Sequence, residues 1–149
     1  MDRRKQGLKR STVTDAGGIP LGAVPAAANR RDDGLLGATL DTLAGASTAI
    51  GRLPAEPVVH LDAGYDYQTC RQVLAARGMA GGIAPRGRPA PVQATRRWPV
   101  ERTHAWGNQD GKLRWCTKRR RIVVQFWLAL AAAAIVCGRL VRRAWTSCR

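Results

Sequence analysis

Acidic residues are scarce in this sequence. It has 10 Asp and Glu against 25 Lys and Arg, a formal net charge of +15 over 149 residues. This imbalance excludes an acidic surface and favours a polyanionic partner, of which nucleic acid is the commonest. A solvated basic surface with no partner is the alternative, and charge alone says nothing about catalysis. The length is enough for one domain with a hydrophobic core.

Cysteine and histidine are also sparse. The four cysteines, at positions 70, 116, 137 and 148, form no close pair and have no histidine at ligand spacing. This pattern argues against a zinc site. It is typical of free thiols in a reducing compartment, so we expect a cytoplasmic protein. His60 and His104 have no nucleophile beside them, and we interpret both as structural residues.

Long apolar runs are limited to residues 122–138, which include Gln125 and lie between Lys118-Arg119-Arg120-Arg121 and Arg139. A membrane span needs roughly 20 apolar residues. The run is at the lower limit and rich in alanine, so we expect a buried or packing helix and no membrane partner. A small membrane protein that uses 122–138 as its span is an alternative.

The first part of the chain, residues 2–28, is predicted to hold a β-hairpin. Strand-like residues at 10–15 and 19–27 are separated by the turn signal Ala16-Gly17-Gly18. A helix is predicted over 34–44, with Asp32 or Asp33 as its N-cap. Residues 45–57, with Pro54 and Pro57, are predicted to be a linker.

The part that follows has the order of a βαβ unit. We expect a buried strand at 58–61, a helix over 65–77 that Gly78 ends, and a weak strand at 79–84 parallel to the first. A helix over 100–108 carries Glu101, and Asp110-Gly111 breaks it. Residues 112–145 hold a basic segment and a terminal helix over 122–143. The sequence therefore predicts an α/β domain, with its catalytic part over 34–106.

Asp62 and Glu101 are the candidate site residues. Asp62 ends the apolar run 58–61, and ligands of parallel α/β sheets bind at the carboxyl ends of strands. Gly64 allows the backbone to turn sharply after it. Carboxylates from separate elements can hold divalent metal ions for in-line displacement at phosphorus. The two acids therefore suggest a metal site that cuts or joins nucleic acid.

Each of these acids also has a structural interpretation. Asp62 could cap a helix that begins near Tyr65, and Glu101 could lie on a solvated helix face. Asp66 is better interpreted as the N-cap of the helix over 67–77. The five tryptophans lie among or near arginines, an arrangement that can stack on and hold DNA, although core packing is favoured for Trp127.

An ordered set of motifs in this chain resembles the DDE transposases of bacterial insertion sequences, with insertion-sequence families four and five the nearest groups. The segments that carry the resemblance run over nearly the whole chain: DRRKQGLKR at 2–10, TDAGGIPLG at 14–22, ANRRD at 28–32, LDAGYD at 61–66 and RWPVERTHAW at 97–106.

The resemblance implies an RNase H-like core and a metal-dependent reaction in which DNA is cut at transposon ends and joined to a target. Asp62 would be the second catalytic carboxylate and Glu101 the third, and both would bind Mg²⁺ or Mn²⁺. DNA would be the partner, and an oligomer is compatible with the resemblance.

The chain also departs from the family pattern. The first catalytic Asp of the family lies on a strand upstream of the segment at 2–10, and Asp2 and Asp15 match other positions. We therefore expect an incomplete core without its first strand, from a decayed copy or from a second reading frame whose partner is the upstream transposase half. Gly107 and Gln109-Asp110-Gly111 stand where a leucine and a basic-aromatic run are usual.

Three functions follow as hypotheses. The first is the C-terminal catalytic part of a DDE transposase, inactive alone because the first Asp is missing. The second is a basic DNA-binding remnant without catalysis, whose binding would depend steeply on salt. The third is the small membrane protein described above.

Overall fold

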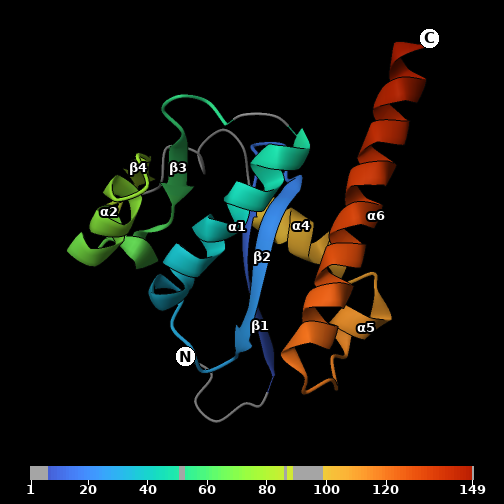
Figure 1. Ribbon diagram of the computed structural model, residues 1–149, viewed down its shortest axis with the longest axis horizontal. Helices are drawn as coiled ribbons and strands as arrows, with labels where there is room; N and C mark the ends of the chain where they lie inside the picture. The colour runs from blue at the N-terminus through green and yellow to red at the C-terminus, as the bar shows by residue number, and fades with distance from the viewer. Residues whose placement is uncertain (1–6, 51–52, 86, 89–98, 149) are drawn as a thin grey trace.

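The computed structural model describes residues 7–50, 53–85, 87–88 and 99–148 (Figure 1). Its elements, in chain order, are β1 (Leu8–Thr14), β2 (Pro20–Ala27), η1 (Asp33–Leu35), α1 (Leu36–Ile50), β3 (Val58–Leu61), η2 (Ala63–Tyr65), α2 (Gln68–Ala75), β4 (Ala80–Ile83), α4 (Pro99–Gly107), α5 (Gly111–Arg114) and α6 (Arg121–Ser147). The predicted α/β class is confirmed.

The predicted hairpin is present. Strands β1 and β2 pair antiparallel, with Leu8 opposite Ala27. The Asp15 carboxylate closes the turn by accepting the backbone N–H groups of Gly17 and Ile19, at 2.9 and 2.7 Å. Gly18 has a φ of +80°, which glycine adopts without steric cost. Strand β1 starts at Leu8, two residues before the predicted start; residues 2–6 lie outside the described part of the chain.

The predicted βαβ unit is also present, with β3 and β4 parallel. Gly78 ends α2 with a φ of +64°. The N–H of Gly78 donates to the Ala75 carbonyl and that of Met79 to the Leu74 carbonyl, the Schellman pattern of a glycine-terminated helix. The helix is shorter than predicted, because residues 63–65 form the separate 3₁₀ turn η2.

Strand β3 is not buried, contrary to the prediction. Its burial alternates: Val58 is 57% exposed and His60 is exposed, whereas Val59 and Leu61 pack against the core. Successive side chains of a strand point to opposite faces, and only one face of this strand meets the core. His60, which lies in the strand that we expected to be buried, is therefore exposed; its ring lies beside Gly82, where a Cβ would come within 2.5 Å of Nδ1.

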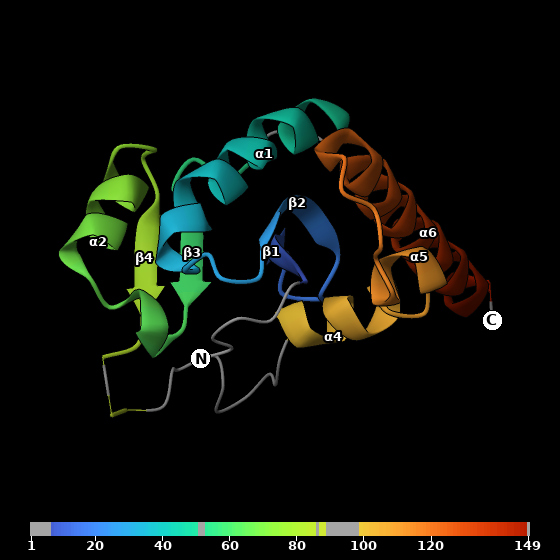
Figure 2. The same cartoon turned by 90° about the horizontal axis from the view of Figure 1, so that it is seen from below.

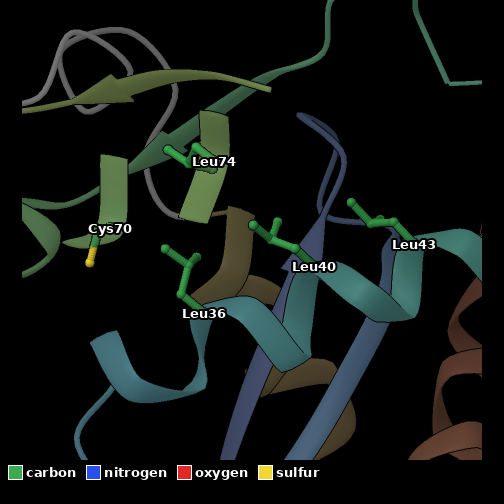
Figure 3. Close-up of a cluster of buried hydrophobic side chains, with 5 residues drawn as sticks. All are labelled: Leu36, Leu40, Leu43, Cys70 and Leu74. Carbon is green, nitrogen blue, oxygen red and sulfur yellow. The ribbon is translucent and has the colours of Figure 1, made fainter. Parts of the chain in front are cut away.

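One core joins two separate sheets. The described strands form the pairs β1–β2 and β3–β4. Helix α1 packs against the hairpin and α2, and the buried side chains are Leu36, Leu40 and Leu43 of α1 with Cys70 and Leu74 of α2 (Figure 3). Side chains from all four strands pack against this cluster. Gly22 of β2 allows α1 to approach closely, because a Cβ there would lie 1.8 Å from Thr42 Oγ1.

Helix α1 corrects two predictions. It continues to Ile50 instead of ending at residue 44, with Gly45 inside it. A glycine inside a helix costs about 1 kcal/mol relative to alanine, and the alanines near Gly45 offset this cost because alanine favours the helix. Neither predicted cap forms a capping bond. The Asp32 carboxylate pairs with Lys9 at 3.1 Å and the Asp33 carboxylate with Arg31 at 3.0 Å, so both acids are engaged by cations.

Helix α6 runs along α4, α5 and β2, with its C-terminal end projecting beyond them (Figure 1). Of the predicted buried or packing helix, the packing is confirmed and the burial is not: the helix packs on one side, where Val124 and Ala131 are buried. The exposed large apolar side chains are Ile122, Phe126, Leu130, Leu140, Val141 and Trp145. It is the one helix in the described ranges long and apolar enough to cross a membrane, judged by length and composition.

Candidate active site

Asp62 follows the last residue of β3, at the carboxyl end of the strand as predicted, and it is exposed. Its Oδ1 accepts the N–H of Gly64 at 2.8 Å, and its carbonyl accepts the N–H of Tyr65 at 3.1 Å. Asp62 thus caps η2, not a helix that begins near Tyr65. The bond fixes one carboxylate oxygen at the surface.

Gly64 is required by this arrangement. A Cβ at position 64 would lie 2.9 Å from Asp62 Oδ1, inside the distance that real Cβ atoms keep. A side chain there would therefore displace the carboxylate. The sequence indicated a sharp turn at Gly64, and the structure adds close contact with the acid as the reason for the glycine.

The neighbourhood of Asp62 is rich in acids. Burial raises the pKa of the Tyr65 hydroxyl, and the charges of Asp32 and Asp62 raise it further. Asp66 is not the cap of α2, because Tyr67 holds that position and the Asp66 carboxylate pairs with Arg71. Tyr65 is therefore a neutral phenol beside the candidate carboxylate.

Glu101 is exposed in the first turn of α4, where a negative charge is favoured by the helix dipole. The opposite face of the helix is held against the hairpin. Thr103 is buried, and its hydroxyl donates to the carbonyls of Gly18 and, at 2.9 Å, Pro99. Glu101 therefore projects from a helix whose position is fixed.

A second set of contacts holds α4 near its C-terminal end. His104 Nε2 lies 3.1 Å from Thr12 Oγ1 of β1, and Arg10 donates to Asn108 Oδ1 at 2.6 Å. Burial, and secondly the charge of Arg10, lower the pKa of His104. The structural interpretation of His104 is thus confirmed. The helix ends at Gly107, and Asp110 caps α5 by accepting the N–H of Lys112.

Asp62 follows β3, whereas Glu101 lies on helix α4, which contacts β1 of the other strand pair. Figure 2 shows η2, which follows Asp62, and α4 on the side of the molecule opposite α1. No hydrogen bond or ion pair joins the two acids among the described residues. Arg97 and Trp98, which precede α4 in the glutamate motif, fall outside the described ranges.

Comparison with known proteins now adds to this geometry. Residues 2–137 match the family described as "Transposase DDE domain". The chain belongs to this family. It is 35% identical over 145 residues to a Burkholderia cepacia protein named "Putative transposase for insertion sequence element IS402", a match that covers 96% of this chain and 68% of the relative. No solved structure matches the chain.

Membership of the transposase DDE domain family confirms the resemblance seen in the sequence and makes transposase the function of this chain. Transposases act on DNA, which agrees with the net charge of +15. The family generally uses divalent metal ions. The DNA-binding remnant and the membrane protein are not favoured.

The carboxylates of this transposase match part of what a divalent ion needs. Mg²⁺ takes oxygen ligands, usually one or two carboxylates with other oxygens. Both acids are exposed and can offer oxygens, but no group of three or more His, Cys, Asp and Glu side chains in the described ranges is arranged to hold a metal. The carboxylate oxygens of Asp62 and Glu101 are of the kind that Mg²⁺ binds. The described residues supply these two carboxylates and do not form a complete metal site.

Sequence reasoning missed the residues that position the transposase's candidate acids. Thr103 carries no motif signal, since its role depends on a carbonyl 85 positions away along the chain.

The exposure of Trp115, which is 69%, was also missed. Basic residues around this tryptophan were the one available signal, and all five tryptophans share it.

Proposed function

We propose that this transposase takes part in divalent-metal-dependent cleavage of DNA at transposon ends and joining of those ends to target DNA. Asp62 and Glu101 are the catalytic, metal-binding carboxylates of the proposal, and Mg²⁺ or Mn²⁺ is the ion. A bound pair of such ions activates an attacking oxygen and stabilises the leaving oxygen at phosphorus.

The observation that carries the proposal is the way Asp62 is held. The Gly64 N–H fixes one carboxylate oxygen at the end of a strand, and Gly64 has no side chain to displace it. An exposed carboxylate held in one orientation loses little freedom when it binds a cation. Glu101, on a helix held by Thr103 and His104, is similarly constrained at its backbone.

The RNase H-like core belongs to the proposal as well. In the described ranges β1 pairs with β2 and β3 with β4, while the core cluster of α1 and α2 packs against both pairs. A strand placed between β1 and β3 would join the two pairs into one sheet and satisfy their unpaired backbone groups. Such a strand, bearing the first catalytic Asp that the resemblance implies, would complete both the sheet and the site.

The test is a transposition assay in cells, with the insertion element expressed from its own reading frames. Asp62→Asn and Glu101→Gln each remove one charge with little change in size. We expect each to lower transposition roughly 10³-fold or more, as loss of a catalytic group does.

Glu56→Gln and Asp41→Asn are the matched controls, because Glu56 and Asp41 are exposed acids outside the candidate site. Both should transpose like the parent. Unchanged transposition in Asp62→Asn, or a parent element that never transposes, would refute the assignment and leave charge-driven DNA binding as the function.

A further inference from the structure

Trp115 follows the last residue of α5 and is 69% exposed, an unusual state for so large an apolar side chain. It lines an open pocket of about 400 Å³ with Asp110, Gly111, Lys112, Thr117 and Lys118. Pockets that bind small molecules have volumes of roughly 300–1,000 Å³, so one nucleoside could be accommodated.

The surroundings of this pocket are strongly basic. Six exposed cations lie in α5, in the loop after it and at the start of α6: Lys112, Arg114, Lys118, Arg119, Arg120 and Arg121. The one acid of the pocket, Asp110, accepts the Lys112 N–H at 2.8 Å, and no acid follows it in the sequence. The pocket therefore attracts a polyanion.

The indole ring is poised for stacking. The guanidinium of Arg114 lies over the ring, 4.9 Å from its centroid, at the distance of a cation–π contact. Beside the ring is Gly111, where even a Cβ would come within 3.9 Å of Cε3 and Cζ3. A longer side chain at position 111 would cover this part of the ring, so glycine keeps it open.

We propose that this pocket binds an unpaired base of DNA, with Trp115 stacked on the base and Lys112 and Lys118 on the neighbouring phosphates. Lysines alone would hold the phosphates of any DNA. An exposed indole, however, reaches the face of a base only where the base is free of its duplex neighbours. The ligand is therefore a single-stranded stretch of DNA.

This inference rests on the proposed function only in taking DNA as the polyanion. Helix α5 lies beside α6, at the end of the molecule away from β3 and β4 (Figures 1 and 2). The pocket is thus distinct from Asp62, and binding there needs no metal.

The experiment measures DNA binding by the full chain in EDTA, using fluorescence anisotropy of a labelled single strand and of the duplex of the same sequence. We expect Trp115→Ala to weaken single-strand binding about 10-fold, as loss of one stacked base does, with duplex binding unchanged. Trp115→Phe keeps a ring and should recover most of the affinity.

Trp145→Ala is the matched control, because Trp145 is 70% exposed and follows Arg142 and Arg143 closely, but does not line this pocket. It should leave both affinities intact. The double substitution Lys112→Ala and Lys118→Ala should weaken the binding of both the single strand and the duplex. It should also reduce the slope of the logarithm of the binding constant against the logarithm of the salt concentration by roughly one to two.

Equal losses for single strand and duplex in Trp115→Ala, no loss at all, or an equal effect of Trp145→Ala would overturn the proposal. The binding assay in EDTA is independent of the transposition assay of Asp62→Asn. A failure of base stacking would therefore leave the catalytic assignment standing, and a failure of catalysis would leave the stacking result intact.

Discussion

His104 links α4 to β1 through its contact with Thr12, and burial and Arg10 hold its pKa below the 6.5 of an unfolded chain, against the weaker opposing effect of Glu101. At pH values between the folded and the unfolded pKa of His104, the unfolded chain binds more protons than the folded one. Stability from this group is therefore full above about pH 6.5 and is lost as the pH falls from that value through the folded pKa of His104.

We accordingly predict that the free energy of unfolding is lower at about pH 5.5 than at about pH 7.5, and that His104→Gln reduces the difference. Urea unfolding followed by circular dichroism measures it. His60→Gln is the control, since His60 is exposed on β3. If His60→Gln removed the pH dependence as well as His104→Gln, the role given to His104 would be wrong.

Single residues were predictable where backbone chemistry decides their role. Gly78 was predicted to end a helix and does so, because glycine alone adopts a positive φ without cost. Asp32 and Asp33 were predicted as caps, but neither is shown to make a side-chain capping bond, since their carboxylates pair with Lys9 and Arg31. The place of Asp62 at a strand end is confirmed, and its metal-binding role stays a prediction.

At the scale of elements, α4 depends on one buried threonine. We predict that Thr103→Val, which keeps the shape but loses the hydroxyl, destabilises the chain by about 1–3 kcal/mol, because the carbonyl of Gly18 is left without its donor. Urea unfolding at neutral pH provides the measurement.

Thr146→Val is the control, because the Thr146 hydroxyl also donates four residues back, to Arg142 at 2.7 Å, but on an exposed surface. It should change stability by less than about 0.5 kcal/mol. Equal effects of the two substitutions would mean that the bond to Gly18 does not anchor α4.

The existence of elements was easier to predict than their extent and burial. Helix α1 was expected to end before Gly45 and continues to Ile50, because nearby alanines support the helix. Strand β3 was expected to be buried, yet Val58 is 57% exposed. Burial depends on which elements cover a strand, and periodicity along one segment does not contain that information.

At the scale of the molecule, charge and apolar surface are found together in the C-terminal part. Helix α6 has six exposed large apolar side chains, and arginines lie near both of its ends. The net charge of +15 favours DNA as the partner, whereas the length and apolar composition of α6 would suit a membrane. These two tendencies make different predictions for cell fractionation.

We predict that the chain fractionates with the soluble phase after an alkaline carbonate wash. Insertion of α6 into a bilayer would break the bond from Arg139 to the Gly17 carbonyl, at 3.3 Å, and the stacking of Arg139 over Trp106, at 5.1 Å. It would also bring a charged arginine toward the hydrocarbon region, which costs several kcal/mol.

Phe126→Glu places a charge in the exposed apolar surface of α6. If the chain is soluble, the variant should be found in the same fraction as the parent chain. A parent chain that stays in the washed membranes, and is released from them by Phe126→Glu, would contradict the prediction and place α6 in the bilayer.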